Sequence, residues 1–539
     1  MTKISYQEYL NQINTCLDQM NESQLRQLLF AIAKRQPEEN RNKFLENFKL
    51  KKHKPFDEKE YQKYLRYIKK LSCDDYMITR EEDEEDYYDD WQDIEPEYIY
   101  SNTENVKTLL NQLFQYAKEL FENEHYRQLN SFLLELSHVH IQVSDDINGI
   151  DEVNIKELMN DDILPDYFNT IRNNWIASIA LSDSNHRAKD FTRLLEFYRE
   201  LTVEMILMNV VDVDEKQILN ELIDFFKDKY QLSYENHFID ACLLLGGSNQ
   251  LLHICEEVGA SHPILCLKCS QLLYDEKRYD ELKSFGLSMV EKMDKYITQR
   301  SDLAKFLIQH QTELNFDEES FKQLIQANFL GSGNVEDFMP CIKYDISFEW
   351  LHQEIEQKLN HYPQETQENQ KIDYLSDNYK YFLRFMDGRL MECWEERNIS
   401  DTNKTAAFIL LLNNHLQSTS ANKALANCLL RTSYFASHTS MDPQEFIEIF
   451  NHWKQNISID FDQSKMIQEI SEQIESRADF VLSNKYRNGY SGIAMQIVAF
   501  AELLVANGMI NFQGDYIDQY HKKYQRFSVF RKELRRFGG

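Results

Sequence analysis

The chain has 539 residues, 42% of them hydrophobic, and a formal net charge of −30. A chain of this length exceeds what one compact core can organise, so two to four domains or a repeat array are expected. The negative charge and a mean hydropathy of −0.59 favour solubility and disfavour general adhesion to nucleic acid or anionic lipid.

Glycine is scarce, which limits the kinds of turn the chain can make. Only 14 Gly and 8 Pro occur, and Gly149 is the first glycine. Tight β-hairpin turns and phosphate-binding glycine loops both depend on this residue. We therefore predict an all-α fold, with helices joined by polar turns and no strand-rich segment.

Several features predict a cytoplasmic protein that does not contact a membrane. The first ten residues, MTKISYQEYL, lack the basic-then-apolar pattern of a signal peptide. The nine cysteines are scattered, which is typical of reduced thiols. The most apolar long stretch, residues 492–510, is interrupted by Gln496, Glu502 and Asn507, so we expect a buried core helix there.

An amphipathic helix with a cationic outer face is predicted over residues 57–71. Its apolar stripe comprises Tyr61, Tyr64, Leu65, Ile68 and Leu71. Its cations, about 180° away at roughly 100° per residue, are Lys59, Lys63, Arg66 and Lys70. With the lysines upstream they form a basic patch at residues 49–70. The patch is a candidate polyanion-binding surface, and its simpler interpretation is a solvated helix face.

An acidic tract follows at residues 81–97, which hold eleven carboxylates and no Lys or Arg. Such a run repels itself and cannot bury apolar surface. We interpret residues 76–101 as an acidic, disordered linker after an N-terminal helical unit at 1–75. Residues 1–80 carry 16 basic and 11 acidic groups, so the acidic tract directly follows a segment of net positive charge. A second hypothesis is therefore that the tract is regulatory and competes with an external polyanion for the basic patch.

Two segments of the chain resemble each other. Residues 120–129 read LFENEHYRQL, and residues 273–282 read LYDEKRYDEL. In each, one helix is predicted to end in a polar turn and a second to begin near the tyrosine, as in tetratricopeptide (TPR) arrays. We predict irregular stacked helical hairpins, a TPR-like helical-repeat solenoid. It would comprise a helical-repeat domain at 102–335 and a C-terminal helical domain at 336–539.

The C-terminal end carries a second basic patch at residues 522–536. Its candidate partner-binding or polyanion-binding residues are Lys522, Lys523, Arg526, Arg531 and Lys532. Aromatic residues are interleaved with these cations. The segment is therefore either a docking surface or a last amphipathic helix that caps the array.

One cysteine pair has zinc-ligand spacing. Cys266 and Cys269 form a C-x-x-C, and Cys255 and His262 lie just upstream. In the alignment of the two similar segments, however, both cysteines of the pair take core positions, where a free cysteine behaves as a small hydrophobe. We expect no metal and no cofactor, and these four residues are weak candidates for a zinc site.

No catalytic signature is present. The sequence has no H-E-x-x-H, no P-loop, no G-x-S-x-G and no dinucleotide fingerprint. Asp212 and Asp214 flank a single valine, and His237 lies downstream. An active site assembled from such distant residues is an alternative, but we expect a protein that is not an enzyme.

Several short stretches carry a family resemblance. They are LRQLLFAIAKRQPE (25–38), Asp145-Asp146-x-Asn148-Gly149, Ala327-Asn328-Phe329 and YHKKYQRFSVFRKEL (520–534). With these the chain resembles the all-helical regions of bacterial SWIM zinc-finger proteins, and the resemblance implies a bacterial helical scaffold. The zinc finger of that family, a C-x-C followed by a C-x-H that is expected to bind nucleic acid or protein, has no counterpart because this sequence contains no C-x-C.

These features together predict a non-enzymatic cytosolic helical-repeat scaffold or adaptor that binds a protein partner. The first alternative is a nucleic-acid-associated protein that uses the basic patches at 49–70 and 522–536. The second alternative is an enzyme whose site is assembled from distant residues.

Overall fold

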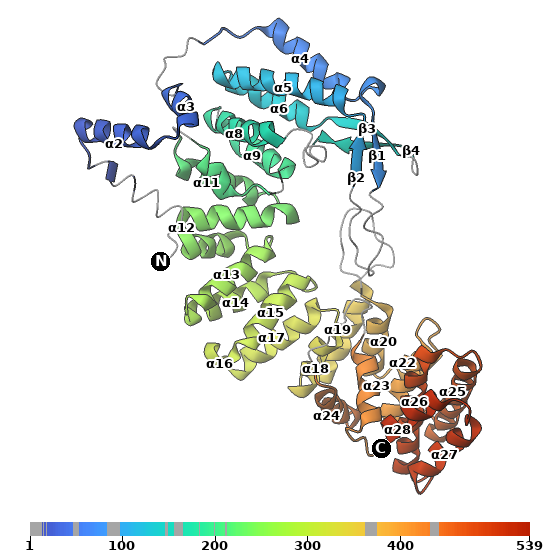
Figure 1. Cartoon of the computed structure of the whole chain (residues 1–539). Coiled ribbons are helices and arrows are strands. Elements are labelled where there is room, and N and C mark those ends of the chain that lie inside the picture. Colours follow the sequence, from blue (N-terminus) through green and yellow to red (C-terminus); the bar gives the residue numbers. More distant parts are fainter. Residues whose placement is uncertain are drawn as a thin grey trace. The chain divides into compact units, whose positions relative to one another are not determined.

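A computed structural model describes residues 13, 16–17, 19–46, 53–82, 98–145, 149–155, 165–182, 184–198, 200–210, 213–361, 375–431 and 441–538. In these residues the protein is mostly helical, with one four-stranded sheet (Figure 1). The chain divides into two compact units, Met1–Ile254 and Cys255–Gly539, and the boundary falls within helix α12. The domain boundaries expected from the sequence remain predictions.

The N-terminal unit is built from helices that pack on their neighbours in chain order. Helix α4 packs on α5 and α6, α8 packs on both of these, and α9 packs on α8 and α11. The helices are α2 (Glu22–Arg35), α3 (Arg41–Glu46), α4 (Glu58–Lys70), α5 (Glu104–Glu122), α6 (Tyr126–Ser137), α8 (Pro165–Leu181), α9 (Ser184–Phe197), α10 (Val203–Met208), α11 (Glu215–Lys227) and most of α12 (Glu235–Val258).

The sheet corrects the all-α prediction. Its strands are β1 (Ile78–Glu82), β2 (Tyr98–Ser101), β3 (His140–Asp145) and β4 (Gly149–Asn154), in the order β2-β1-β3-β4. Strand β1 is antiparallel to β2 and parallel to β3, and β3 is antiparallel to β4. Strands of four to six residues are too short to stand out by periodicity, and β1 pairs with a strand more than fifty residues away.

The same sheet includes residues from both ends of the segment 76–101, which the sequence predicts as a linker. This segment begins in β1 and ends in β2, which pair with each other through Glu82 and Tyr98. Glu81 and Glu82 of the acidic tract are therefore strand residues, and residues 83–97 lie outside the described part of the chain. The linker at 76–101 and the domain boundary that it would mark remain predictions.

The C-terminal unit is helical, and its helices from α17 onward share a large hydrophobic core that extends from Ile325 to Leu534. Helix α26 lies at its centre, in contact with α22, α23, α25, α27 and α28. The helices are α13 (Pro263–Asp275), α14 (Tyr279–Lys292), α15 (Thr298–Gln309), α16 (Gln311–Leu314), α17 (Glu318–Gly331), α18 (Val335–Lys343), α19 (Phe348–His361), α20 (Asp377–Met386), α21 (Leu390–Glu395), α22 (Asp401–Leu412), α23 (Ser420–Leu430), α24 (Pro443–Lys454), α25 (Gln463–Ser483), α26 (Tyr490–Ala506), α27 (Gln513–Lys523) and α28 (Ser528–Gly538).

In the described part of the chain, two helical segments are long and apolar enough to cross a membrane by length and composition, Glu235–Val258 and Arg487–Ala506. The second contains α26, whose surroundings confirm the buried core helix predicted for residues 492–510. The first is interrupted because Gly246 and Gly247 leave helical geometry, and Gly247 has a φ of 66°. The helix is therefore broken at this glycine pair.

The polar turns predicted in the two similar segments are present and share one geometry. Helices α5 and α6 form one pair, and α13 and α14 form the other. Glu124 and Lys277 occupy equivalent turn positions in the left-handed region, with φ of 61° and 60°. The next amide in each turn, that of His125 or Arg278, donates to a carbonyl five residues back at 2.9 Å. This hydrogen bond pairs a carbonyl that the helix end would leave free. A repeat array remains a prediction.

Replacement of Lys277 by Gly should stabilise the C-terminal unit. The left-handed conformation costs a residue with a Cβ about 1 kcal/mol, and glycine avoids that cost. We expect K277G to raise the free energy of unfolding, measured by urea denaturation, by about that amount. The matched control is K268G, at an exposed position within α13, which should lower it by roughly 0.7 kcal/mol. Destabilisation by both variants would contradict this account of the turn.

The end of α17 is a junction of buried polar groups. A Cβ on Gly331 would lie 2.4 Å from the carbonyl oxygen of Ile297, so only glycine fits there. Just beyond it, Asp337 accepts hydrogen bonds from Asn328 Nδ2 at 3.1 Å and from Ser332 Oγ at 2.6 Å. All three polar side chains are buried. The network joins α17 to α18 and satisfies the polar groups that the helix end brings into the interior.

Lys358 of α19 completes this junction. It is fully buried, and its ammonium donates to the carbonyl oxygens of Phe329, Leu330 and Ser332 at 2.8, 2.6 and 2.6 Å. These acceptors form the C-terminal end of α17, where a cation is favoured. Burial lowers the pKa of Lys358 from 10.5 to about 7, and the nearby Asp337 carboxylate opposes that change.

The pKa of Lys358 predicts how stability varies with pH. Because the folded pKa lies below the unfolded one, unfolding takes up a proton between about pH 7 and 10.5. The contribution of Lys358 to stability is therefore lost as pH falls toward 7, by at most about 1.4 kcal/mol per pH unit. We expect K358M to be destabilised by roughly 3 kcal/mol, because it leaves three carbonyls unpaired.

The difference in the free energy of unfolding between wild type and K358M, measured by urea denaturation, should increase from pH 7 to pH 9. Only the wild type takes up a proton at Lys358 on unfolding. The exposed control K268M should show no such pH-dependent difference. A difference in free energy of unfolding between wild type and K358M that stays constant with pH would contradict the prediction.

Candidate binding surfaces

The apolar side of α4 packs as its helical spacing predicts. Tyr61, Ile68 and Leu71 are buried. Tyr64 stacks on Tyr116 of α5, with ring centroids 4.0 Å apart and an interplanar angle of 11°. The Tyr61 hydroxyl donates to the carbonyl oxygen of Gln128 in α6 at 3.2 Å. These contacts fix the rotation of α4 about its axis, and therefore which side chains face solvent.

The cations of α4 lie on the opposite, exposed side. Lys59, Lys63, Arg66 and Lys70 are all exposed, and none of them pairs with a carboxylate of the described residues. The ring of Tyr67 lies between two of them, with Lys63 Nζ at 5.5 Å and Lys70 Nζ at 5.3 Å from its centroid. Such cation–π contacts hold an ammonium group in place without neutralising its charge.

A pocket of about 380 Å³ lies beside this cationic face, where the end of α4 meets α5 and the short 3₁₀ helix Asp74–Tyr76. Its lining combines one ammonium group, one carboxylate, two phenols and the polar side chains of α5. The lining residues are Tyr67, Lys70, Asp75, Tyr76, Asn105, Thr108, Leu109 and Gln112.

Part of the C-terminal basic patch is paired with carboxylates of its own unit. Lys523 Nζ lies 2.8 Å from Glu475 and 3.1 Å from Asp479 of α25. Hydrogen bonds from Tyr524 and Lys523 lower the pKa of Asp479. Phe530 of α28 is buried, and α28 packs on α26. Helix α28 therefore packs by its apolar side as the last helix of the unit, while Lys522, Arg526 and Lys532 are exposed and Arg531 is half-buried.

The three cysteines of the zinc candidate cluster in the core. Cys255, Cys266 and Cys269 are fully buried, as the core positions predict. Hydrogen bonds to the other two thiols, together with burial, raise the pKa of Cys255. His262, the fourth candidate, lies before α13 and is buried. No described group of three or more His, Cys, Asp and Glu side chains could hold a metal ion.

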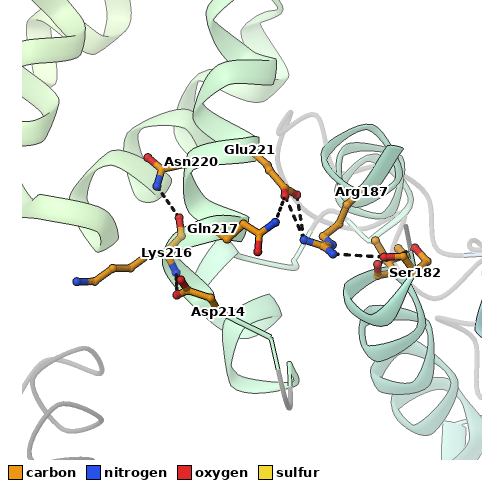
Figure 2. Close-up of polar contacts among 8 residues, drawn as sticks. Ser182, Arg187, Asp214, Lys216, Gln217, Asn220 and Glu221 are labelled. Atoms are coloured by element: carbon orange, nitrogen blue, oxygen red, sulfur yellow. Dashed lines mark hydrogen bonds and ion pairs between the residues drawn. The ribbon is translucent and has the colours of Figure 1, made fainter. Parts of the chain in front are cut away.

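The enzyme alternative names Asp212 and Asp214 as candidate active-site carboxylates, and the structure describes only Asp214. Asp214 precedes α11, and its Oδ1 accepts from the backbone amide of Lys216 at 3.0 Å (Figure 2). Asp212 lies outside the described residues. Burial lowers the pKa of His237, and the described structure gives this histidine no hydrogen bond to Asp214. The geometry therefore shows Asp214 as a structural cap.

The strongest polar contact near that cap is also structural. Arg187 of α9 donates to both carboxylate oxygens of Glu221 in α11 at 3.2 Å, and to the carbonyl oxygen of Ser182 at 3.3 Å (Figure 2). Gln217 donates to the same carboxylate at 2.9 Å. Both bonds to Glu221 come from Nη1, and Nη2 donates to Ser182, so one guanidinium group links α9 and α11.

Sequence reasoning missed a groove in the C-terminal unit. It has a volume of about 570 Å³, is open to solvent, and is formed by α22, α25 and α26. Its lining residues are Asp401, Thr402, Thr405, Glu469, Glu472, Gln473, Ser476, Arg477, Phe480 and Gln496. Helix α22 lies about fifty residues before α25 in the sequence, and α26 follows α25, so no local pattern predicts the groove.

The base of the groove is fixed by hydrogen bonds between its helices. Thr405 Oγ1 donates to Gln473 at 3.2 Å, and Gln496 Nε2 donates to the carbonyl oxygen of Thr402 at 3.2 Å. At one end the ring of Phe480 is 53% exposed and lies 5.7 Å from that of Tyr486, itself 55% exposed. An exposed aromatic pair beside a preformed groove is typical of a protein-binding surface.

No protein-family model, curated protein or solved structure matches the chain. The resemblance to SWIM zinc-finger proteins therefore remains a prediction, and the binding surfaces are interpreted from their geometry and chemistry alone.

Proposed function

We propose that this protein is a non-catalytic helical scaffold that binds a protein partner through the groove of its C-terminal unit. The observation that carries the proposal is the open groove along α25, which ends at the exposed ring of Phe480. A TPR-like stacking of the helix pairs, which belongs to the same proposal, would provide extended surfaces of this kind. The resemblance to SWIM-associated helical regions is consistent with a scaffold.

The chemistry of the groove defines what its partner should carry. Glu469 and Glu472 line one end, and Phe480 lies eleven residues further along the same helix, about 16 Å away. A partner segment with a basic side chain and an apolar side chain about five extended residues apart would match both ends. The apolar contact would supply most of the affinity, since buried aromatic anchors dominate interfaces of this type.

Substitution of Phe480 should weaken this interaction without affecting the fold, because the ring is largely exposed. We expect F480S to reduce retention of the partner from a native lysate about tenfold, as is typical for loss of an aromatic anchor. The matched control is F512S, since Phe512 is 62% exposed in the same unit and lies outside the groove lining. Quantitative mass spectrometry of the retained proteins is the measurement. A protein retained equally by wild type and F480S is not the groove partner, and equal retention of every protein would contradict the proposal.

A second candidate function is favoured by a separate observation. The row of exposed cations on α4 has no carboxylate partner in the described structure, although the chain carries 89 acidic residues. This surface fits a polyanion such as a nucleic acid, whose binding to cations is electrostatic and depends on salt. The acidic tract at residues 81–97 would compete for the same cations, and this is the regulatory part of the proposal.

Neutralising the tract should therefore strengthen polyanion binding. We expect conversion of every Asp to Asn and every Glu to Gln over residues 83–97 to raise the affinity for heparin severalfold at about 50 mM salt, and less at about 200 mM. In a chain whose Lys59, Lys63, Arg66 and Lys70 are all changed to Gln, the same neutralisation should have no further effect. An unchanged heparin affinity at low salt would remove the regulatory role of the tract.

A further inference from the structure

We infer that the pocket at the end of α4 is a subsite for one base of a single-stranded nucleic acid, whose phosphates follow the cationic face of α4. This inference rests on the second candidate function above, polyanion binding by α4, and specifies its ligand and its contacts. Its basis is the juxtaposition of a row of unpaired cations with a polar pocket that carries tyrosine rings.

The cations are arranged along the helix as a track for a strand. Lys59 and Lys70 are eleven residues apart, so the row is about 16 Å long. A single strand carries one phosphate per roughly 3.4 Å of duplex rise and more widely spaced ones when extended, so the row covers several phosphates. Tyr67 holds Lys63 and Lys70 over its ring, which leaves both ammonium groups ordered and charged.

The pocket has what a base edge requires. Asn105, Thr108 and Gln112 recur on the exposed side of α5 and point polar groups into it. Their side chains make no hydrogen bond to other described residues, so their donors and acceptors remain available. An amide offers both a donor and an acceptor, which suits the edge of a base. The Watson–Crick edge of a base is exposed only in unpaired nucleotides.

The pocket also has what a base face requires. The ring of Tyr76 and the side chain of Leu109 provide flat and apolar surface, while Tyr67 keeps the two ammonium groups beside the pocket. Stacking on an aromatic ring is the usual way that proteins hold single-stranded bases, and it tolerates any base. Asp75 is the one carboxylate of the lining and can accept a hydrogen bond from an exocyclic amino group.

A single strand fits better than a duplex. Helix α4 is packed on α5 and α6 along its apolar side, so its cations lie on one exposed flank beside the pocket. A duplex keeps its bases inside the stack. It would contact the cations of α4 and leave the pocket empty.

The test is fluorescence anisotropy of the full chain with a labelled thymidine oligonucleotide of about 20 nucleotides, at about 50 mM salt. Two matched pairs of variants separate the pocket from general charge. Lys70 lines the pocket and Lys69 does not, so K70Q should weaken binding about tenfold and K69Q about twofold. Gln112 lines the pocket and Gln115 of the same helix does not, so Q112A should weaken binding about fivefold and Q115A should have no effect.

The possible failures are distinguishable. Equal affinities within each pair, with salt-dependent binding retained, would overturn the base subsite and leave polyanion binding by α4 intact. A duplex of the same length that binds as tightly and loses the same affinity with Q112A would also overturn it. Absence of salt-dependent binding, or no effect of K59Q, K63Q and R66Q combined, would overturn polyanion binding itself. All of these positions are exposed, so the variants should fold, as circular dichroism would verify.

Discussion

Buried and half-buried basic side chains bind the C-terminal carbonyls of neighbouring helices in the C-terminal unit. A unit built from many short helices has many helix ends, and each leaves carbonyls without a partner inside the helix. Lys358 binds three such carbonyls at the end of α17, and Lys454 binds those of Leu410 and Asn413 at 3.1 and 2.7 Å. Burial lowers the pKa of Lys454 to about 8.

Two further contacts follow the same rule. Lys404 donates to the carbonyl oxygen of Glu396 after α21, and Arg300 donates to that of Val290 in the last turn of α14. Left-handed turns such as that at Lys277 satisfy other helix ends through the backbone. Helix ends in the core of the unit are thus paired by cations or by turn amides, which is the condition for packing so many short helices together.

The cations that are paired within the fold can be compared with the exposed cations of α4. The chain has 59 basic and 89 acidic residues, so carboxylate partners are abundant. At the C-terminal end, Lys523 and Arg536 each find one. The cations of α4 find none in the described structure, although Tyr67 keeps two of them ordered. An unpaired row in an acidic chain is the strongest electrostatic indication of an external anionic ligand that this protein offers.

The features that depend on local periodicity could be predicted from the sequence. The rotation of α4, with Ile68 buried and Lys63 exposed, follows from helical spacing alone. The core position of Cys266 followed from the similarity of two segments. The features that depend on distant residues could not be predicted. Strand β1 pairs with β3, and the groove joins Thr405 to Gln473. The role of Lys358 was hidden for the same reason, because a lysine in a sequence indicates solvent exposure.

The central claim is that the unpaired cations and the adjacent pocket of the N-terminal unit form a single-strand binding surface. Photo-crosslinking of the full chain to a single-stranded oligonucleotide containing 4-thiothymidine, followed by mass spectrometry of the peptides, tests this claim most directly. The account predicts crosslinks within residues 58–76 and 104–112, concentrated at Tyr67 and Tyr76. Crosslinks confined to residues 522–536, or scattered evenly over the exposed lysines, would contradict it.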